Sequence, residues 1–237
     1  MAVLMILHKL IFRYLKHKDD EGFYLLQAQY TMKWLEKVGV KLGAGTKVLD
    51  LGCGHGIFGA ELAKNGCLVT FADVENTVVR GLGPIDFRRT DIMKDDLVDL
   101  GQYDLVICAN VIEHLRDPRA LIDNAQRLLA PGGKLYLCWP NWLSPRGGHE
   151  FSPFHYLGPR RGHLVYDRLA GRKRVHTPYV TLFPTSISGI LKMLRRNNEL
   201  RILRVVPRYY PEFSFITRVP ILREFLTWNC AILLERC

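Results

Sequence analysis

The sequence of 237 residues lacks any apolar run near the roughly 18 residues that a membrane-spanning helix needs. Its six cysteines form no C-x-x-C pair and mostly lie in apolar, strand-like runs. That distribution favours reduced, buried thiols over a disulfide framework, so we expect a cytoplasmic protein. The sequence also contains no internal repeat and no low-complexity tract. Its length suits one large α/β domain or two small ones.

The N-terminal stretch has no basic segment before its apolar residues and no small-residue cleavage site, so we expect no signal peptide. Basic and apolar residues alternate at helical spacing between Leu4 and Lys18. This pattern predicts either a helix packed on the domain, which we favour, or a basic amphipathic helix that makes peripheral contact with a membrane surface.

Positive charge is concentrated in the C-terminal part of the chain. Residues 1–139 hold 17 basic and 17 acidic residues, whereas residues 140–237 hold 16 basic and 6 acidic residues. The second part therefore carries the whole net charge of +10. Such a charge suits an anionic substrate, an anionic membrane or nucleic acid, although a solvated basic surface would have the same composition.

Strand-like and helix-like segments alternate along the chain. We expect helices at 22–39, 57–66, 118–130 and 184–196, and strands at 47–51, 67–73, 85–91, 103–109, 134–139, 200–207 and 229–237. The alternation predicts a doubly wound α/β fold with a mostly parallel, seven-stranded sheet. Ligands of such sheets bind beyond the carboxyl ends of the strands. Asp50, Asp73, Asp91 and Asn110 all fall at or near those ends.

A glycine-rich turn, VLDLGCGHGIFG at 48–59, follows the first predicted strand. The dinucleotide pattern G-x-G-x-x-G fails when counted from Gly52, because Ile57 occupies the third glycine position. Counted from Gly54 the pattern fits, with Gly59 as the third glycine, so glycine spacing alone does not exclude a dinucleotide.

The residues around this turn discriminate between the candidate cofactors better than the glycines do. Asp50 would repel a pyrophosphate but would attract a cation, and no Gly-Lys-Ser/Thr follows to form a nucleotide triphosphate loop. S-adenosylmethionine, with its sulfonium and ammonium groups, fits this charge. Asp73 lies 21 residues after Gly52, a distance that suits an acid binding ribose hydroxyls in either cofactor.

Five segments carry a resemblance to a known family: VLDLGCGHG, VTFADV, RRTDI, YDLVICANVIEHLRDP and RLLAPGGKLYLCWPN. Their order and spacing resemble class I S-adenosylmethionine-dependent methyltransferases over residues 25–141. The likeness is closest to the type 11 subgroup, which includes the ubiquinone-biosynthesis O-methyltransferases. The resemblance implies a Rossmann-like fold and a cofactor site made of Asp50, Gly52, Cys53, Gly54, Gly56, Asp73, Val74, Asp91, Ile92 and Asn110.

Within that site, the resemblance places Asp50 and the Gly52–Gly56 loop around the methionine moiety and Asp73 on the ribose. Asp91 and Ile92 would contact the adenine. The segment after Asp73, DVENTVV, departs from the family in lacking a small polar residue soon after the acid.

Methyl transfer to a hydroxyl requires alignment of nucleophile, carbon and sulfur, and removal of the hydroxyl proton. His114, just past the fourth predicted strand, is the candidate base or substrate-orienting residue. The alternative is that the Glu113–His114 pair only organises the turn.

A long insertion rich in Pro, Gly, His, Arg and aromatic residues follows the fifth strand, where we expect a lid over the substrate. We therefore divide the chain into N-terminal helices covering the site (1–40), a cofactor-binding core (41–141), a substrate lid (142–184) and a C-terminal helix and strands (185–237). Candidate substrate residues in the lid are His149, His155, Arg160 and Arg161. His149, Glu150 and His155 do not have an established metal-ligand spacing, so we expect no metal.

The acceptor is the least defined part of the prediction. After the fourth strand the chain reads ANVIEH and lacks the Asp/Asn-Pro-Pro-aromatic motif of enzymes that methylate nucleic-acid amino groups. We therefore favour a small or lipid-linked, anionic metabolite methylated on oxygen. Three alternatives stay open: an RNA methyltransferase that uses the basic half, a catalytically silent methyltransferase-like binding module, and a dinucleotide oxidoreductase.

Overall fold

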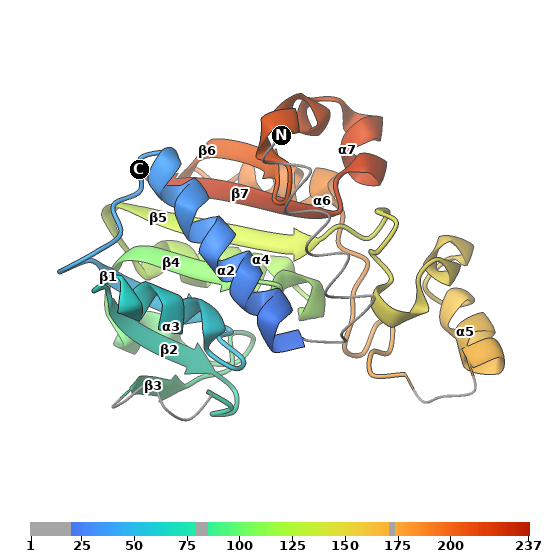
Figure 1. Cartoon of the computed structure of the whole chain (residues 1–237), viewed down its shortest axis with the longest axis horizontal. Coiled ribbons are helices and arrows are strands. Elements are labelled where there is room, and N and C mark those ends of the chain that lie inside the picture. Colours follow the sequence, from blue (N-terminus) through green and yellow to red (C-terminus); the bar gives the residue numbers. More distant parts are fainter. Residues whose placement is uncertain (1–19, 79–84, 171–173) are drawn as a thin grey trace.

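The computed structural model describes residues 20–78, 85–170 and 174–237 (Figure 1). Its α-helices are α2 (Asp20–Lys37), α3 (Ile57–Lys64), α4 (Pro118–Arg127), α5 (Gly162–Ala170), α6 (Ile187–Leu194) and α7 (Pro220–Leu226). Its strands are β1 (Lys47–Leu51), β2 (Leu68–Asp73), β3 (Asp86–Arg89), β4 (Tyr103–Ala109), β5 (Leu129–Pro140), β6 (Leu200–Pro207) and β7 (Asn229–Arg236). Short 3₁₀ helices include η3 (Ile112–His114), η4 (His149–Phe151) and η5 (Phe154–Leu157).

The seven strands form one sheet in the order β3-β2-β1-β4-β5-β7-β6 (Figure 1). The pairs among β1 to β5 are parallel, and β7 runs antiparallel between β5 and β6. The predicted doubly wound, mostly parallel sheet is therefore confirmed. Strand order reverses between β1 and β4, which is where ligands bind in this kind of fold.

Helices cover both faces of the sheet, with α2 and α3 on one face and α4 and α6 on the other (Figure 1). Strand β5 shows why both faces are apolar, because successive side chains of a strand point to opposite sides. Leu137 and Trp139 pack in the core under α4 and α6, whereas Tyr136 and Cys138 pack in the core under α2 and α3.

Local sequence signals set the ends of the helices. The Asp117 side chain accepts a hydrogen bond from the Arg119 backbone N–H and caps α4, and Pro118 is the first helical residue. Helix α3 ends at the predicted Asn65-Gly66 pair, where Gly66 adopts a φ of +87°.

Residues 142–184 lie beyond the carboxyl end of β5 and contain η4, η5 and α5 (Figure 1). Trp142, Phe151, Tyr166 and Leu182 form a small apolar cluster of this segment's own. Its role as a substrate lid stays a prediction, as do the other predicted domain boundaries. The amphipathic pattern between Leu4 and Lys18 lies outside the described residues. Among the described helices, none is long and apolar enough to cross a membrane.

Candidate active site

The glycine-rich turn after β1 requires backbone conformations that favour glycine. Gly52, Gly54 and Gly56 have φ angles of +74°, +50° and +73°. A Cβ at Gly52 would also lie 2.4 Å from a Val111 methyl carbon. The turn thus places backbone without side chains at the carboxyl end of the sheet, as the sequence predicted.

Two carboxylates hold the turn in place. Asp50 accepts a hydrogen bond from the Gly59 backbone N–H at 2.8 Å, and Asp73 accepts one from Gly54 N–H at 2.8 Å. The other Asp73 oxygen accepts from Val74 N–H at 2.7 Å. Burial raises the pKa of Asp50 to about 7, partly offset by the Gly59 bond and reinforced by the Asp73 charge.

A cavity of about 600 Å³ opens beside this turn. Four residues of the predicted cofactor site line it, namely Gly52, Cys53, Gly54 and Asn110. Glu21 and Tyr24 of α2 also line it, together with His55, Ile57, Phe58 and Ala109. The predicted N-terminal cover of the site did not single out Glu21 or Tyr24, because nothing in the helical pattern shows which residues of α2 reach the carboxyl edge of the sheet.

Asp91 and Ile92, the predicted adenine contacts, are held by local interactions. The Asp91 carboxylate accepts from Met93 N–H at 2.9 Å and pairs with Lys94 at 2.9 Å. Ile92 is buried in the core, and its carbonyl accepts a hydrogen bond from Asn124. Val74 is about half exposed next to Asp73. The cofactor roles of Asp91, Ile92 and Val74 stay predictions.

A second cavity of about 270 Å³ adjoins the first, and Tyr24 and Asn110 line both. Asn110 adopts a left-handed backbone with a φ of +59°, and its side-chain oxygen accepts from Asn229 at 3.0 Å. Aromatic walls come from Phe23, Tyr24, Tyr209 and Trp228, and polar groups come from Gln27, Glu113, His114, Arg146, His149, Glu150 and His176. Apolar, aromatic walls with a few polar groups are typical of small-molecule sites.

Glu113 is the least expected residue of the second cavity. Its side chain is only 1% exposed, and neither carboxylate oxygen has a hydrogen-bond partner within the described part of the chain. Burial raises the pKa of Glu113 to about 8. The adjacent pair Glu113–His114 was the one signal in the sequence, and it did not show that Glu113 faces a ligand cavity.

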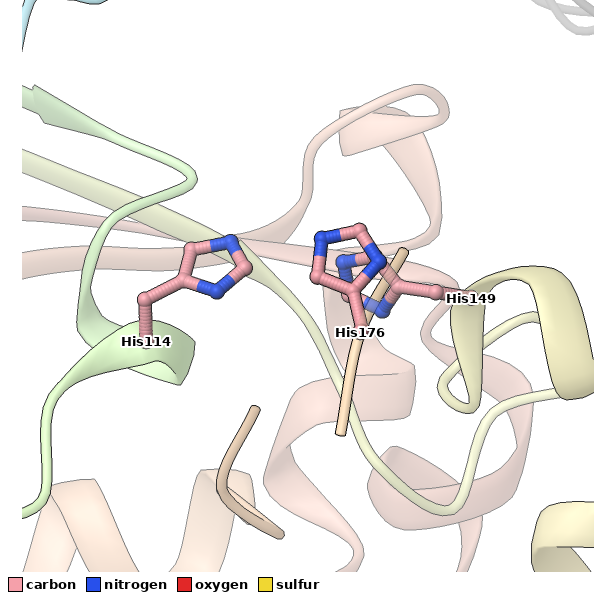
Figure 2. A group of neighbouring side chains, drawn as sticks. All are labelled: His114, His149 and His176. Atoms are coloured by element: carbon pink, nitrogen blue, oxygen red, sulfur yellow. The ribbon is translucent and has the colours of Figure 1, made fainter. Parts of the chain in front are cut away.

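Three histidines from distant segments meet in one cluster (Figure 2). One ring nitrogen from each of His114, His149 and His176 lies within 4.8 Å of the other two. Burial lowers the pKa of His114 and lowers that of His149 to about 4, with the neighbouring histidines adding to both shifts. The sequence pointed to His114 and His149 separately and gave no sign of His176, which no spacing rule connects to them.

Glu150 holds His176 and the residue before it in place through hydrogen bonds. Its carboxylate accepts from the His176 ring at 2.8 Å and from the Val175 and His176 backbone N–H groups at 2.9 and 2.6 Å. Burial acts to raise the pKa of Glu150, but these hydrogen bonds outweigh it and lower the pKa to about 2.

The remaining candidate substrate residues lie elsewhere. His155 is buried, and its Nε2 lies 3.0 Å from the Ser144 carbonyl oxygen. Arg160 and Arg161 are exposed just before α5 and do not line the second cavity. The basic residue that does line it is Arg146. Substrate contact by His155, Arg160 and Arg161 stays a prediction.

The sheet order, the glycine turn after β1 and the acid at the end of β2 together define a methyltransferase of the class I fold.

Comparisons with known proteins agree with this class. Residues 23–174 match the family described as "Methyltransferase domain". An uncharacterized methyltransferase of Mycobacteroides abscessus is 31% identical over 229 residues, covering 91% of this chain and 87% of the relative. One from Mycobacterium ulcerans is 32% identical over 236 residues, covering 94% and 91%. The chain therefore belongs to this methyltransferase family.

Solved structures share the fold. An S-adenosylmethionine-dependent methyltransferase from Mesorhizobium loti has a TM-score of 0.59 and 22% identity, covering 87% of this chain and 98% of that one. Magnesium protoporphyrin IX methyltransferase from Synechocystis, solved with bound S-adenosylhomocysteine, has a TM-score of 0.57 and 20% identity, covering 94% and 89%. The particular similarity to ubiquinone-biosynthesis enzymes stays a prediction from the motifs.

Proposed function

We propose that the protein methylates an oxygen atom of a small or lipid-linked, anionic metabolite. In this proposal the cofactor occupies the cavity beside the glycine turn, and the acceptor occupies the smaller cavity. The observation that carries it is that Tyr24 and Asn110 line both cavities, so a methyl group at their junction faces the acceptor. Such alignment is the main requirement of methyl transfer.

The chemistry of the smaller cavity supports the acceptor class. Aromatic side chains such as Phe23 and Trp228 suit an apolar, planar body, and Arg146 supplies a positive charge for an anionic group. Arg160 and Arg161 are exposed in the same 142–184 segment as Arg146, and we propose that they add positive charge for an anionic acceptor. The motif similarity to ubiquinone-biosynthesis O-methyltransferases supports oxygen as the atom that is methylated.

Calorimetric titration of the whole chain with S-adenosylmethionine, S-adenosylhomocysteine and NAD tests the cofactor part. We expect micromolar binding of the first two compounds and none of NAD. Binding of NAD alone would overturn the proposal in favour of an oxidoreductase. Binding of none of the three would instead favour a silent binding module.

The acceptor part needs a separate measurement. With the labelled methyl donor, we expect transfer to hydroxylated or carboxylated small molecules and none to RNA. Tight RNA binding that weakens steeply with salt, together with methylation of RNA, would overturn the acceptor class in favour of the nucleic-acid alternative.

The affinity for S-adenosylmethionine is expected to rise with pH between 6 and 8. Asp50 has a pKa of about 7, and a cationic ligand binds more tightly once this carboxylate is ionised. A change of two pH units across this pKa gives roughly a tenfold difference in affinity. Titration calorimetry at several pH values measures it.

Two controls isolate Asp50 as the cause. S-adenosylhomocysteine lacks the sulfonium charge, so its affinity should change less with pH. The isosteric variant Asp50→Asn should bind S-adenosylmethionine with little pH dependence. An equally steep profile for both ligands, or for the variant, would mean that another group is responsible.

A further inference from the structure

The side chains His114, His149 and His176 form a cluster that the methyl-transfer site alone does not explain. His114 ends η3 after β4, His149 begins η4, and His176 lies in the chain that follows α5. Their ring centroids are separated by 5.8 Å (His114–His149), 5.4 Å (His114–His176) and 4.8 Å (His149–His176). Figure 2 shows the rings of His149 and His176 side by side, facing His114.

Hydrogen bonds fix which nitrogen of each ring is free. The Nδ1 atoms of His114 and His149 lie 2.6 and 3.4 Å from the carbonyl oxygens of Thr181 and Gly147. Carbonyl oxygens only accept, so each Nδ1 carries the proton and each Nε2 of a neutral ring presents a lone pair. The Glu150 carboxylate likewise accepts from Nδ1 of His176 at 2.8 Å.

This arrangement is the one that metal-binding histidines show. A ligating histidine usually donates its second ring N–H to a carboxylate or a backbone carbonyl, which fixes the orientation of the ring. Ligand nitrogens of a tetrahedral zinc ion lie about 3.4 Å apart, given Zn–N distances of about 2.0–2.1 Å. One ring nitrogen of each of the three histidines lies within 4.8 Å of the other two, which is close enough for the rings to form a ligand set if an ion drew these nitrogens together.

A separate observation points to a ligand at the same place. Glu113 is fully buried beside the cluster, with one carboxylate oxygen 4.0 Å from His114 Nε2 and neither oxygen hydrogen-bonded within the described residues. A buried carboxylate without partners is costly unless a ligand satisfies it.

We propose that His114, His149 and His176 bind a divalent first-row transition-metal ion, with zinc as the reference ion. Imidazole ligands suit zinc, iron, copper and nickel, whereas magnesium and calcium prefer oxygen ligands. Three histidines would leave one coordination position open, as in catalytic zinc sites, and all three line the smaller cavity. Glu113 accepts a hydrogen bond from the water or acceptor at that position. The sequence-based expectation of no metal rests on His149, Glu150 and His155 and does not consider His114 or His176.

The metal ion would bind and position the oxygen atom of the acceptor. This step rests on the proposed function. A hydroxyl bound to the ion loses its proton to bulk water more readily than a free hydroxyl does. Its oxygen then forms the new bond to the methyl carbon while the carbon–sulfur bond breaks. The electron pair of that bond stays on sulfur, and neutral S-adenosylhomocysteine leaves. This assigns the acceptor to hydroxyl compounds that bind a transition metal through oxygen.

Metal titration of the chelator-treated whole chain tests the site directly. We expect one Co²⁺ or Zn²⁺ per chain, with visible absorption of the Co²⁺ form typical of low coordination number, and no comparable binding of Mg²⁺. His149→Ala and His176→Ala should each weaken metal affinity at least 100-fold. Glu150→Gln should weaken it about 10–100-fold, because it loosens the orientation of His176.

His163→Ala is the matched control. This histidine lies in α5 of the same segment, and its Nδ1 lies 2.7 Å from the Pro159 carbonyl oxygen, but it lies outside the cluster. The metal affinity of the His163→Ala variant should equal that of the wild type. Absence of stoichiometric binding to the wild type, or equal affinity in His149→Ala and His176→Ala, would overturn the metal site.

Binding of S-adenosylhomocysteine to the same preparations separates the two proposals and confirms that each variant is folded. Cofactor binding without metal binding would leave the methyltransferase proposal intact and remove the metal site. Metal binding without cofactor binding would leave the metal site intact and remove the methyltransferase proposal. If the metal also positions the acceptor, chelation should abolish methyl transfer while S-adenosylhomocysteine still binds.

Discussion

Substitution of Asp73 by alanine is expected to lower the affinity for S-adenosylhomocysteine at least 100-fold. The carboxylate holds the glycine turn through Gly54 N–H at 2.8 Å and Val74 N–H at 2.7 Å, and in our proposal it also binds the ribose hydroxyls. Hydrogen bonds to a charged group contribute about 1.5–3 kcal/mol each, so the loss of two or more gives a change of this size. Titration calorimetry measures the affinity.

Asp104→Ala is the matched control for this experiment. Asp104 is also an aspartate that accepts a backbone N–H, from Lys47 at 2.9 Å, but it lies near the amino end of β4. The control should bind the cofactor like the wild type, and both variants should show a cooperative thermal transition. Affinity within about threefold of the wild type for a folded Asp73→Ala protein would contradict the ribose role.

Substitution of Gly59 by alanine is expected to destabilise the fold by about 3 kcal/mol. A Cβ at this position would lie 2.3 Å from the Phe71 ring, which is buried where α3 lies against β2. Helix α3 or the ring must therefore move, and the hydrogen bond from Gly59 N–H to Asp50 is strained at the same time. Urea denaturation, with the unfolding slope checked for constancy, measures the change in the free energy of unfolding.

A second substitution tests the cause of that change. Phe71→Leu removes the ring atoms that the new methyl group would meet, so the double variant Gly59→Ala/Phe71→Leu should lose less stability than the sum of the two single changes. The double-mutant cycle isolates this coupling. Additive losses would show that the contact with Phe71 is not the reason glycine is required.

The cofactor half of the site could be predicted because its determinants are local. The turn at Gly52, Gly54 and Gly56 follows β1 directly, and Asp73 ends β2, so short motifs specify both. Parallel strands bring their carboxyl ends to one edge, and this rule alone places Asp50 and Asp73 together. The fold class and the approximate strand positions could be predicted from the alternation of strand-like and helix-like segments along the chain.

The acceptor half could not be predicted in the same way. Tyr24 comes from α2, Glu113 from η3 and Trp228 from the chain before β7, yet all three line one cavity. No spacing in the sequence connects them, because they approach one another only when helices and strands pack. The same holds for His176, which joins His114 and His149 from a separate segment.

The sequence by itself thus determined the doubly wound sheet and the glycine turn, because each depends on periodicity or on residues a few positions apart, and its resemblance to methyltransferases implied the methyl donor. Only the tertiary structure decided where Glu113 and the three histidines lie. It did so because η3, which holds Glu113 and His114, and the segment after β5, which holds His149 and His176, come together through packing and not through any repeating pattern. The groups that would contact the acceptor are therefore a property of the folded chain.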